Sequence, residues 1–161
     1  MNKRGHVLNA VLLSVGIGCI LNPALEVQTV YFVLKVSVPI TLGALFPDVD
    51  TSFGSHRKTF HNLAVLAAFV AFPYYFDNLD FAWIGVLTHY VLDVVGTRRG
   101  IALFYPLWSA EFGMPTGVTV GSRWTDLVTL AVTAVELAVV AAVVYRVPQV
   151  SIEYGPVAFG V

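Results

Sequence analysis

Long apolar stretches dominate the sequence and leave few folds open to it. They cover approximately residues 7–21, 29–47, 62–76, 81–95 and 125–147. A helix that crosses a bilayer needs about 20 predominantly apolar residues, and the longer stretches meet this length. With 57% hydrophobic and 12% charged residues, the chain lies far from the roughly 45–50% and 25% of soluble domains. We therefore expect an all-α, polytopic membrane bundle of about five helices, or of four, forming a single integral membrane domain over residues 1–161.

The positive charges indicate how such a bundle is oriented. If the five segments alternate in direction, all but one of the following cations fall on one side, and only Arg146 falls near the other: Lys3, Arg4, Arg57, Lys58, Arg98, Arg99, Arg123 and Arg146. Because Lys and Arg are enriched in cytoplasmic loops, we expect a multi-pass plasma-membrane protein with a cytoplasmic amino terminus. The bilayer is then its main partner. With a formal net charge of −1, the chain has no general electrostatic attraction to nucleic acid, so no nucleic-acid partner is indicated.

Residues 96–124 form the longest irregular region of the chain. The apolar segment "IALFYPLW", residues 101–108, is too short to span the membrane and is interrupted by Pro106. We expect this segment either to re-enter the membrane or to lie on its surface.

Histidines and aspartates gather where the predicted helices begin or end on one side of the membrane. This set contains all four histidines of the chain, and its members are His6, Asp48, Asp50, His56, His61, His89 and Asp93. A random scatter of ionisable residues would not converge in this way. The distribution therefore predicts a polar site at the cytoplasmic helix ends.

The spacing of these residues suits a metal ion. His89 and Asp93 are four residues apart and share a helical face, whereas Asp48 and Asp50, in an extended segment, would point the same way. Gly54 allows the chain to turn so that His61 faces them. Mixed imidazole and carboxylate ligands favour zinc, with manganese or iron as alternatives. The metal-ligating set that we predict is His6, Asp48, Asp50, His61, His89 and Asp93.

Simpler roles exist for several of these residues. His6 could cap its helix, the two aspartates could stabilise a turn, and His89 could form a structural hydrogen-bonded pair with Asp93. His56 and Arg57 could contact anionic lipid headgroups. Joint convergence at one membrane face favours the metal site.

A catalytic centre of this kind would carry out metal-assisted hydrolysis through an activated water. Asp48 or Asp50 could orient the water. A phosphate could be held by His56, Arg57, Arg98 and Arg99. We expect a phosphoester substrate. A phospholipid or a related lipid is favoured because the site is interfacial, and a soluble phosphoester is the alternative.

The alternative class is a non-catalytic membrane protein with a structural metal, or a small ion transporter. A transporter would need ionisable groups throughout the membrane depth, where the candidates are Lys35 and Glu136. These two residues lie at nearly the same predicted depth, so we expect a structural ion pair between them. The alternative for Lys35 is that its ammonium group extends to the outer interface.

Four segments carry a resemblance to a known family. In order, "GHVLNA", "GALFPDVD", "HRKTFH" and "GVLTHYVLDVVGTRRGIALFYP" resemble the signatures of the YdjM-like family of membrane-bound metal-dependent hydrolases. The resemblance covers about residues 5–108 and leaves out the final apolar segment, about 125–147. Thr51 stands where the family often has a histidine. The resemblance implies a membrane-bound hydrolase that depends on a metal.

A more distant likeness concerns the order of the ligands. An amino-terminal His, an Asp, a His and a His-x-x-x-Asp pair occur in an order similar to that of zinc-dependent phospholipase C. This likeness implies as ligands His6, one of Asp48 or Asp50, His61, His89 and Asp93, with one carboxylate bridging. The chain lacks the further His and His-x-x-x-Glu pair of those enzymes, so one or two ions are expected.

Overall fold

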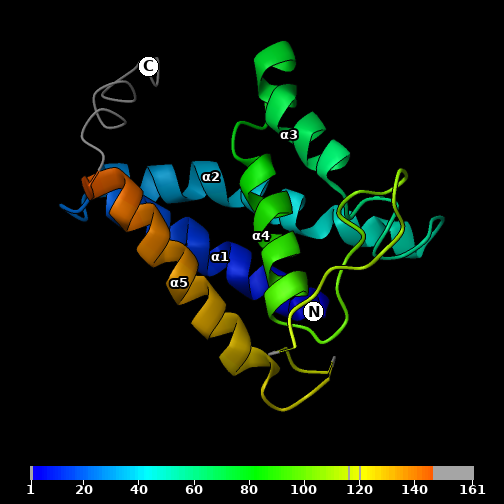
Figure 1. The fold of residues 1–161 in the computed structure, drawn as a ribbon. Helices are drawn as coiled ribbons and strands as arrows, with labels where there is room; N and C mark the ends of the chain where they lie inside the picture. Colours follow the sequence, from blue (N-terminus) through cyan, green and yellow to red (C-terminus); the bar gives the residue numbers. More distant parts are fainter. Residues whose placement is uncertain (1, 116, 120, 147–161) are drawn as a thin grey trace.

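The computed structural model describes residues 2–115, 117–119 and 121–146. They form five α-helices and one short 3-10 helix (Figure 1), which are α1 (Lys3–Leu21), α2 (Val27–Leu45), η1 (Pro47–Thr51), α3 (Leu63–Phe76), α4 (Ala82–Val95) and α5 (Thr125–Arg146). Within the described ranges there is no strand, and two isolated bridges, Thr97 with Val118 and Ile101 with Phe112, join the ends of the long loop between α4 and α5. The prediction of an all-helical bundle is confirmed.

The helices differ in whether they can cross a membrane alone. By length and composition, α1, the α2–η1 segment and α5 are candidate spans. The helices α3 and α4 have 14 residues each. At 1.5 Å per residue each rises about 21 Å, which is less than the roughly 30 Å hydrocarbon core. Three of the five predicted helices therefore have spanning length by themselves.

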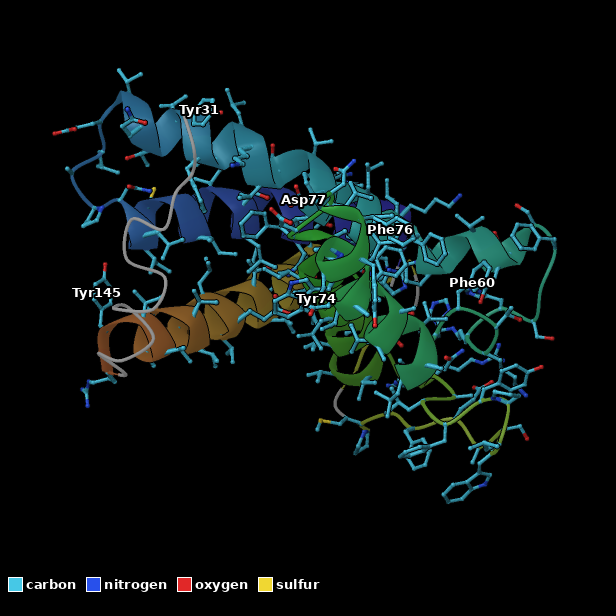
Figure 2. The ribbon with its side chains drawn as sticks, turned by 90° about the horizontal axis from the view of Figure 1, so that it is seen from above. Tyr31, Phe60, Tyr74, Phe76, Asp77 and Tyr145 are labelled. Atoms are coloured by element: carbon cyan, nitrogen blue, oxygen red, sulfur yellow. The ribbon has the colours of Figure 1, made fainter. Side chains whose placement is uncertain are left out.

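Helix α1 lies between α2 and α5, as both views show (Figures 1 and 2). Its buried residues Leu13 and Ile17 pack against Phe32, Val36 and Ile40 of α2 to form the main apolar core.

Contacts at both ends show that α1 and α5 run in the same direction. The hydroxyl of Tyr145, labelled in Figure 2, donates to the carbonyl of Ile20 at 2.7 Å. At the other end Arg4 lies 3.6 Å from Asp126. The amino-terminal ends of α1 and α5 therefore lie on the same side, as the alternating arrangement requires.

The ion pair expected between Lys35 and Glu136 does not form. Glu136 Oε2 accepts a hydrogen bond from Asn9 Nδ2 of α1 at 2.6 Å, and the same amide donates to Thr133 Oγ1 at 2.9 Å. Lys35 is exposed on α2. Counting residues from the helix ends predicts two charges at a similar depth in the membrane. It does not show that α1 lies between α2 and α5 and separates the two side chains.

Two glycines bring the backbones of α2 and α4 into direct contact. A Cβ atom added to Gly43 would lie 1.9 Å from the carbonyl oxygen of Ala82, and one added to Gly85 would lie 2.0 Å from that of Ile40. Small residues at such crossings let membrane helices approach closely. This approach sets the position of the carboxyl-terminal half of α4 against the end of α2.

We predict that Gly85→Ala separates α4 from α2 and destabilises the protein by about 1–3 kcal/mol, because the clash is with backbone atoms that cannot rotate away. The measurement is thermal unfolding in detergent. Gly16→Ala is the matched control, since its added Cβ meets the tip of the flexible Leu137 side chain. Equal losses in the two variants would contradict the prediction.

Candidate metal centre

Six of the predicted site residues lie together at one end of the bundle. His6 comes from the first turns of α1, Asp48 and Asp50 from η1, His61 from the segment before α3, and His89 and Asp93 from the last turns of α4. All six are buried. The structure therefore brings together four helix ends and buries their ionisable side chains side by side.

Two carboxylate oxygens lie close to the facing nitrogens of two histidines. His61 Nε2 lies 3.0 Å from His89 Nε2. Asp93 Oδ2 lies 3.7 Å from the His61 nitrogen and 3.6 Å from the His89 nitrogen. Asp48 Oδ1 lies 3.9 and 3.8 Å from the same two nitrogens. A tetrahedral metal with ligand bonds of about 2.0–2.1 Å holds its donors about 3.3 Å apart, so either carboxylate oxygen lies where it can share one transition-metal ion with the two imidazoles.

The other ring nitrogens fix which tautomer each histidine adopts. His89 Nδ1 lies 2.7 Å from the carbonyl oxygen of Ala44, which can only accept, so Nδ1 carries the proton. His61 Nδ1 lies 3.0 Å from Asp50 Oδ2 and donates in the same way. Both Nε2 atoms then present lone pairs to each other across 3.0 Å. Two facing lone pairs repel, and a bound cation converts this contact into an attraction.

The protonation state of His61 agrees with a ligand role. Burial, reinforced by the neighbouring His89, lowers the pKa of His61 from 6.5 to about 4. His61 is therefore neutral at pH 7, and a neutral imidazole is the form that binds a metal.

Asp50 takes a different position from Asp48. Its two oxygens accept from the imidazoles of His56, at 2.9 Å, and His61, at 3.0 Å. The expectation of an extended segment was wrong: residues 47–51 form the 3-10 helix η1, in which residues two apart do not share a face. Asp48 consequently reaches the donor set, whereas Asp50 orients the histidines. Carboxylates that accept from the second nitrogen of a ligand histidine are common around protein metals.

His6 stacks on His89 rather than joining the four donors. The two rings are nearly parallel, with centroids 3.7 Å apart. In the part of the chain that the structure describes, neither nitrogen of His6 has a hydrogen-bond partner, and its Nε2 lies 3.6 Å from Asp93 Oδ1. The Asp93 carboxylate thus points one oxygen at His6 and the other at His61 and His89. His6, His89 and Asp93 offer ligand atoms that lie within 4.8 Å of one another, so this group can also hold an ion.

His56 is the most open of the histidines. Its side chain is 39% exposed, and its Nδ1 is held by Asp50. Together with Asp48 and His61 it forms a second group whose possible ligand atoms lie within 4.8 Å of one another. The structure places this residue at the mouth of the centre.

Arg57, which we expected to bind phosphate, is buried and engaged with the backbone. Its Nη1 donates to the carbonyl oxygens of Arg99 and Gly100 and to Thr97 Oγ1. Its own carbonyl accepts from Ala102 N at 2.9 Å. Arg57 adopts a positive φ of 68°, so the surrounding loop holds it in a costly conformation. The side chain joins the loop before α3 to the loop after α4.

The remaining arginines differ in their availability. Arg99 forms two hydrogen bonds of 2.9 Å with Glu111, and this partner lowers the pKa of the Glu111 carboxyl. Arg98 is exposed, and its side chain has no partner among the described residues. It lines a pocket of about 160 Å³ together with Arg57, Thr97 and Thr119. Of the predicted cations, Arg98 is the one free to meet an anion.

Sequence reasoning missed the groups that hold His61 and His89 in place. Asn62 caps α3 by accepting from Val65 N, and its amide donates to the carbonyls of Lys58 and Thr59. The Tyr90 hydroxyl donates to the carbonyl of Phe60 at 2.6 Å. An asparagine directly before an apolar run is a helix-start signal that could have been read. The Ala44 carbonyl leaves no such signal, because any residue carries one.

We predict that the purified protein contains one or two equivalents of a transition metal, with zinc preferred. His89→Ala and Asp93→Asn should remove it, whereas Asp50→Asn should weaken binding by about 10–100-fold, because it loosens the His61 ring without deleting a donor. Elemental analysis and metal titration measure both effects. Asp126→Asn is the control, as an exposed carboxylate at the same end of the bundle. Metal retained by Asp93→Asn would contradict the assignment.

Comparison with known families shows to which family the chain belongs. Neither curated proteins nor solved structures give a match. The family model described as "YdjM inner membrane protein" matches residues 1–154, which extends the resemblance seen at residues 5–108 through α5. This match and the three candidate spans indicate a multi-pass protein of the inner, or plasma, membrane. The chain belongs to the YdjM inner membrane protein family.

Proposed function

We propose that this protein is a membrane-bound, metal-dependent hydrolase that cleaves a phosphoester at one end of its helical bundle. The observation that carries the proposal is the pair of Nε2 lone pairs facing each other at 3.0 Å, flanked by the carboxylates of Asp48 and Asp93. Buried acceptors without donors are costly, so their concentration here calls for a bound cation. Such a metal would supply Lewis acidity and activate water for attack near neutral pH.

The chain's own residues would hold and orient this chemistry. His61, His89, Asp48 and Asp93 supply the donors, and Asp50 and the Ala44 carbonyl fix the two imidazole rings. Zinc suits this donor set best, with manganese and iron as alternatives.

His56 is placed to move a proton. Its imidazole is partly open to solvent and is oriented by Asp50. In hydrolysis, the attacking water releases one proton to the solvent, its oxygen bonds to phosphorus as the bond to the leaving oxygen breaks, and the leaving oxygen takes up a proton. His56 can supply this proton as a general acid. Arg98 is the exposed cation that can contact a phosphate oxygen, in the pocket that it lines with Arg57 and Thr97.

A structural metal is the second candidate, and one observation favours it. Two imidazoles and two carboxylates offer the number of protein donors found in structural zinc sites, whereas catalytic zinc usually has three protein ligands and an open position. A metal held in this way would tie together the ends of α2, α3 and α4 without turnover.

We predict metal-dependent turnover of a generic phosphomonoester or phosphodiester reporter by the protein in detergent. Chelation should abolish activity and zinc, manganese or iron should restore it. His56→Ala should keep its metal but lose about 10²–10⁴-fold in kcat, because it removes a proton donor and no metal ligand. Fully metallated protein that hydrolyses neither reporter would favour the structural role.

A further inference from the structure

The loop between α4 and α5 presents an apolar tip to its surroundings. Residues 101–110 contain no charged side chain. Leu107 is 96% exposed, Trp108 59% and Phe104 47%. We call Phe104, Leu107 and Trp108 the apolar tip. Large apolar side chains gathered on an exposed loop mark a surface that contacts something other than water.

The tip has a defined shape. Ile101 and Phe112 exchange two backbone hydrogen bonds of 3.0 and 2.8 Å, and Trp108 N donates to the Phe104 carbonyl at 3.1 Å. The Trp108 ring lies 6.3 Å from the Phe104 ring and 5.5 Å from the Phe112 ring. At the base, a Cβ on Gly100 would lie 1.9 Å from the Phe112 carbonyl oxygen, so the two arms touch. The exposed apolar surface is therefore built into the loop.

The same loop is attached to the metal centre. Leu63 N donates to the Leu103 carbonyl at 2.9 Å, two residues after His61. Ala102 N donates to the Arg57 carbonyl at 2.9 Å, next to His56. The loop that carries the apolar tip is thus fastened to the chain on both sides of His61, while the three tip side chains themselves project from the loop.

Cations lie at the base of the tip. Arg98 is exposed and its side chain has no partner within the described ranges. Lys58 is half-buried, next to the Arg57 carbonyl that accepts from Ala102 N. Tryptophan and phenylalanine beside lysine and arginine are typical of segments that lie in the headgroup region of a membrane. Anionic phospholipids are the complement to this charge.

We propose that the apolar tip inserts into the boundary between headgroups and acyl chains of the adjacent bilayer, and that the metal centre takes its substrate from that layer. The substrate class is then a phospholipid or another lipid phosphoester. The insertion stands on the loop alone, whereas the choice of substrate rests on the proposed hydrolase function.

Trp108 provides a direct probe of insertion. In Trp83→Phe/Trp124→Phe protein it is the only tryptophan. The protein is placed in vesicles of phosphatidylethanolamine and phosphatidylglycerol, with one lipid brominated near the top of its acyl chain. Insertion predicts that the brominated lipid lowers the emission by about twofold while iodide in the buffer has little effect.

In the control, the single tryptophan is moved to another position at the same end of the molecule. Ser55→Trp, made in the background that also carries Trp108→Phe, places the indole on the exposed loop before His56. We expect iodide to quench it and brominated lipid to leave it unchanged. Quenching of Trp108 by iodide and not by brominated lipid would overturn the insertion.

A second variant tests the source of the substrate. Leu107→Ser/Trp108→Ser should lower kcat/KM on phosphatidylglycerol vesicles by about tenfold, because it removes the apolar area that holds the loop in the lipid. Activity on a soluble phosphoester should stay unchanged. Leu25→Ser is the control, since Leu25 is also a leucine and is 68% exposed, but lies at the opposite end of α1 and α2.

The outcomes separate the two proposals. Equal losses on the soluble and vesicle substrates, at normal metal content, would overturn the lipid as the source of substrate. Lipid quenching of Trp108 in a protein that hydrolyses neither substrate would support the insertion and reject the hydrolase function.

Discussion

Two imidazole nitrogens facing each other at 3.0 Å impose the central constraint on this bundle. Each ring is held by an acceptor behind it, the Ala44 carbonyl for His89 and the Asp50 carboxylate for His61. Neither ring can turn away without leaving a buried polar group unpaired, which costs about 1–3 kcal/mol. The repulsion is thus fixed in place by the fold, and a cation between the rings relieves it. Binding of that cation would stabilise the folded state by mass action.

The packing of α2 on α4 serves this arrangement. Gly43 and Gly85 let the two backbones touch, and His89 lies one turn after Gly85. Its Nδ1 then reaches the carbonyl at the end of α2, a group that becomes available because a helix leaves its last carbonyls without partners. The Ala44 carbonyl gains a hydrogen-bond donor, and the His89 ring gains a fixed orientation. Fold stability and site geometry therefore depend on the same crossing.

The sequence predicted the helices and the convergence of their polar ends, because apolar length and residue spacing are local properties. It did not predict the 3-10 turn that separates the roles of Asp48 and Asp50, since this depends on the chain leaving α2 through Pro47. It also misplaced the partner of Glu136, because residues at one depth can face different helices. The positive charge of Arg57 suggested a phosphate-binding role. Its burial and its hydrogen bonds to backbone carbonyls depend on the tertiary structure, which the sequence does not reveal. Local sequence patterns thus predicted where the polar site lies, whereas the role of each residue in it depends on long-range packing.

Burial within the centre indicates the direction from which a ligand would arrive. His6, His61, His89 and Asp93 are enclosed, Asp48 has slight exposure, and His56 is open. The path to the donors therefore runs past Asp48 and His56. The segment that carries His56 and His61 is fastened to the loop bearing Leu107 and Trp108 through the backbones of Arg57 and Leu63. A displacement of that loop would move the chain on both sides of His61, so a surface that the apolar tip contacts is coupled through the backbone to the opening beside His56.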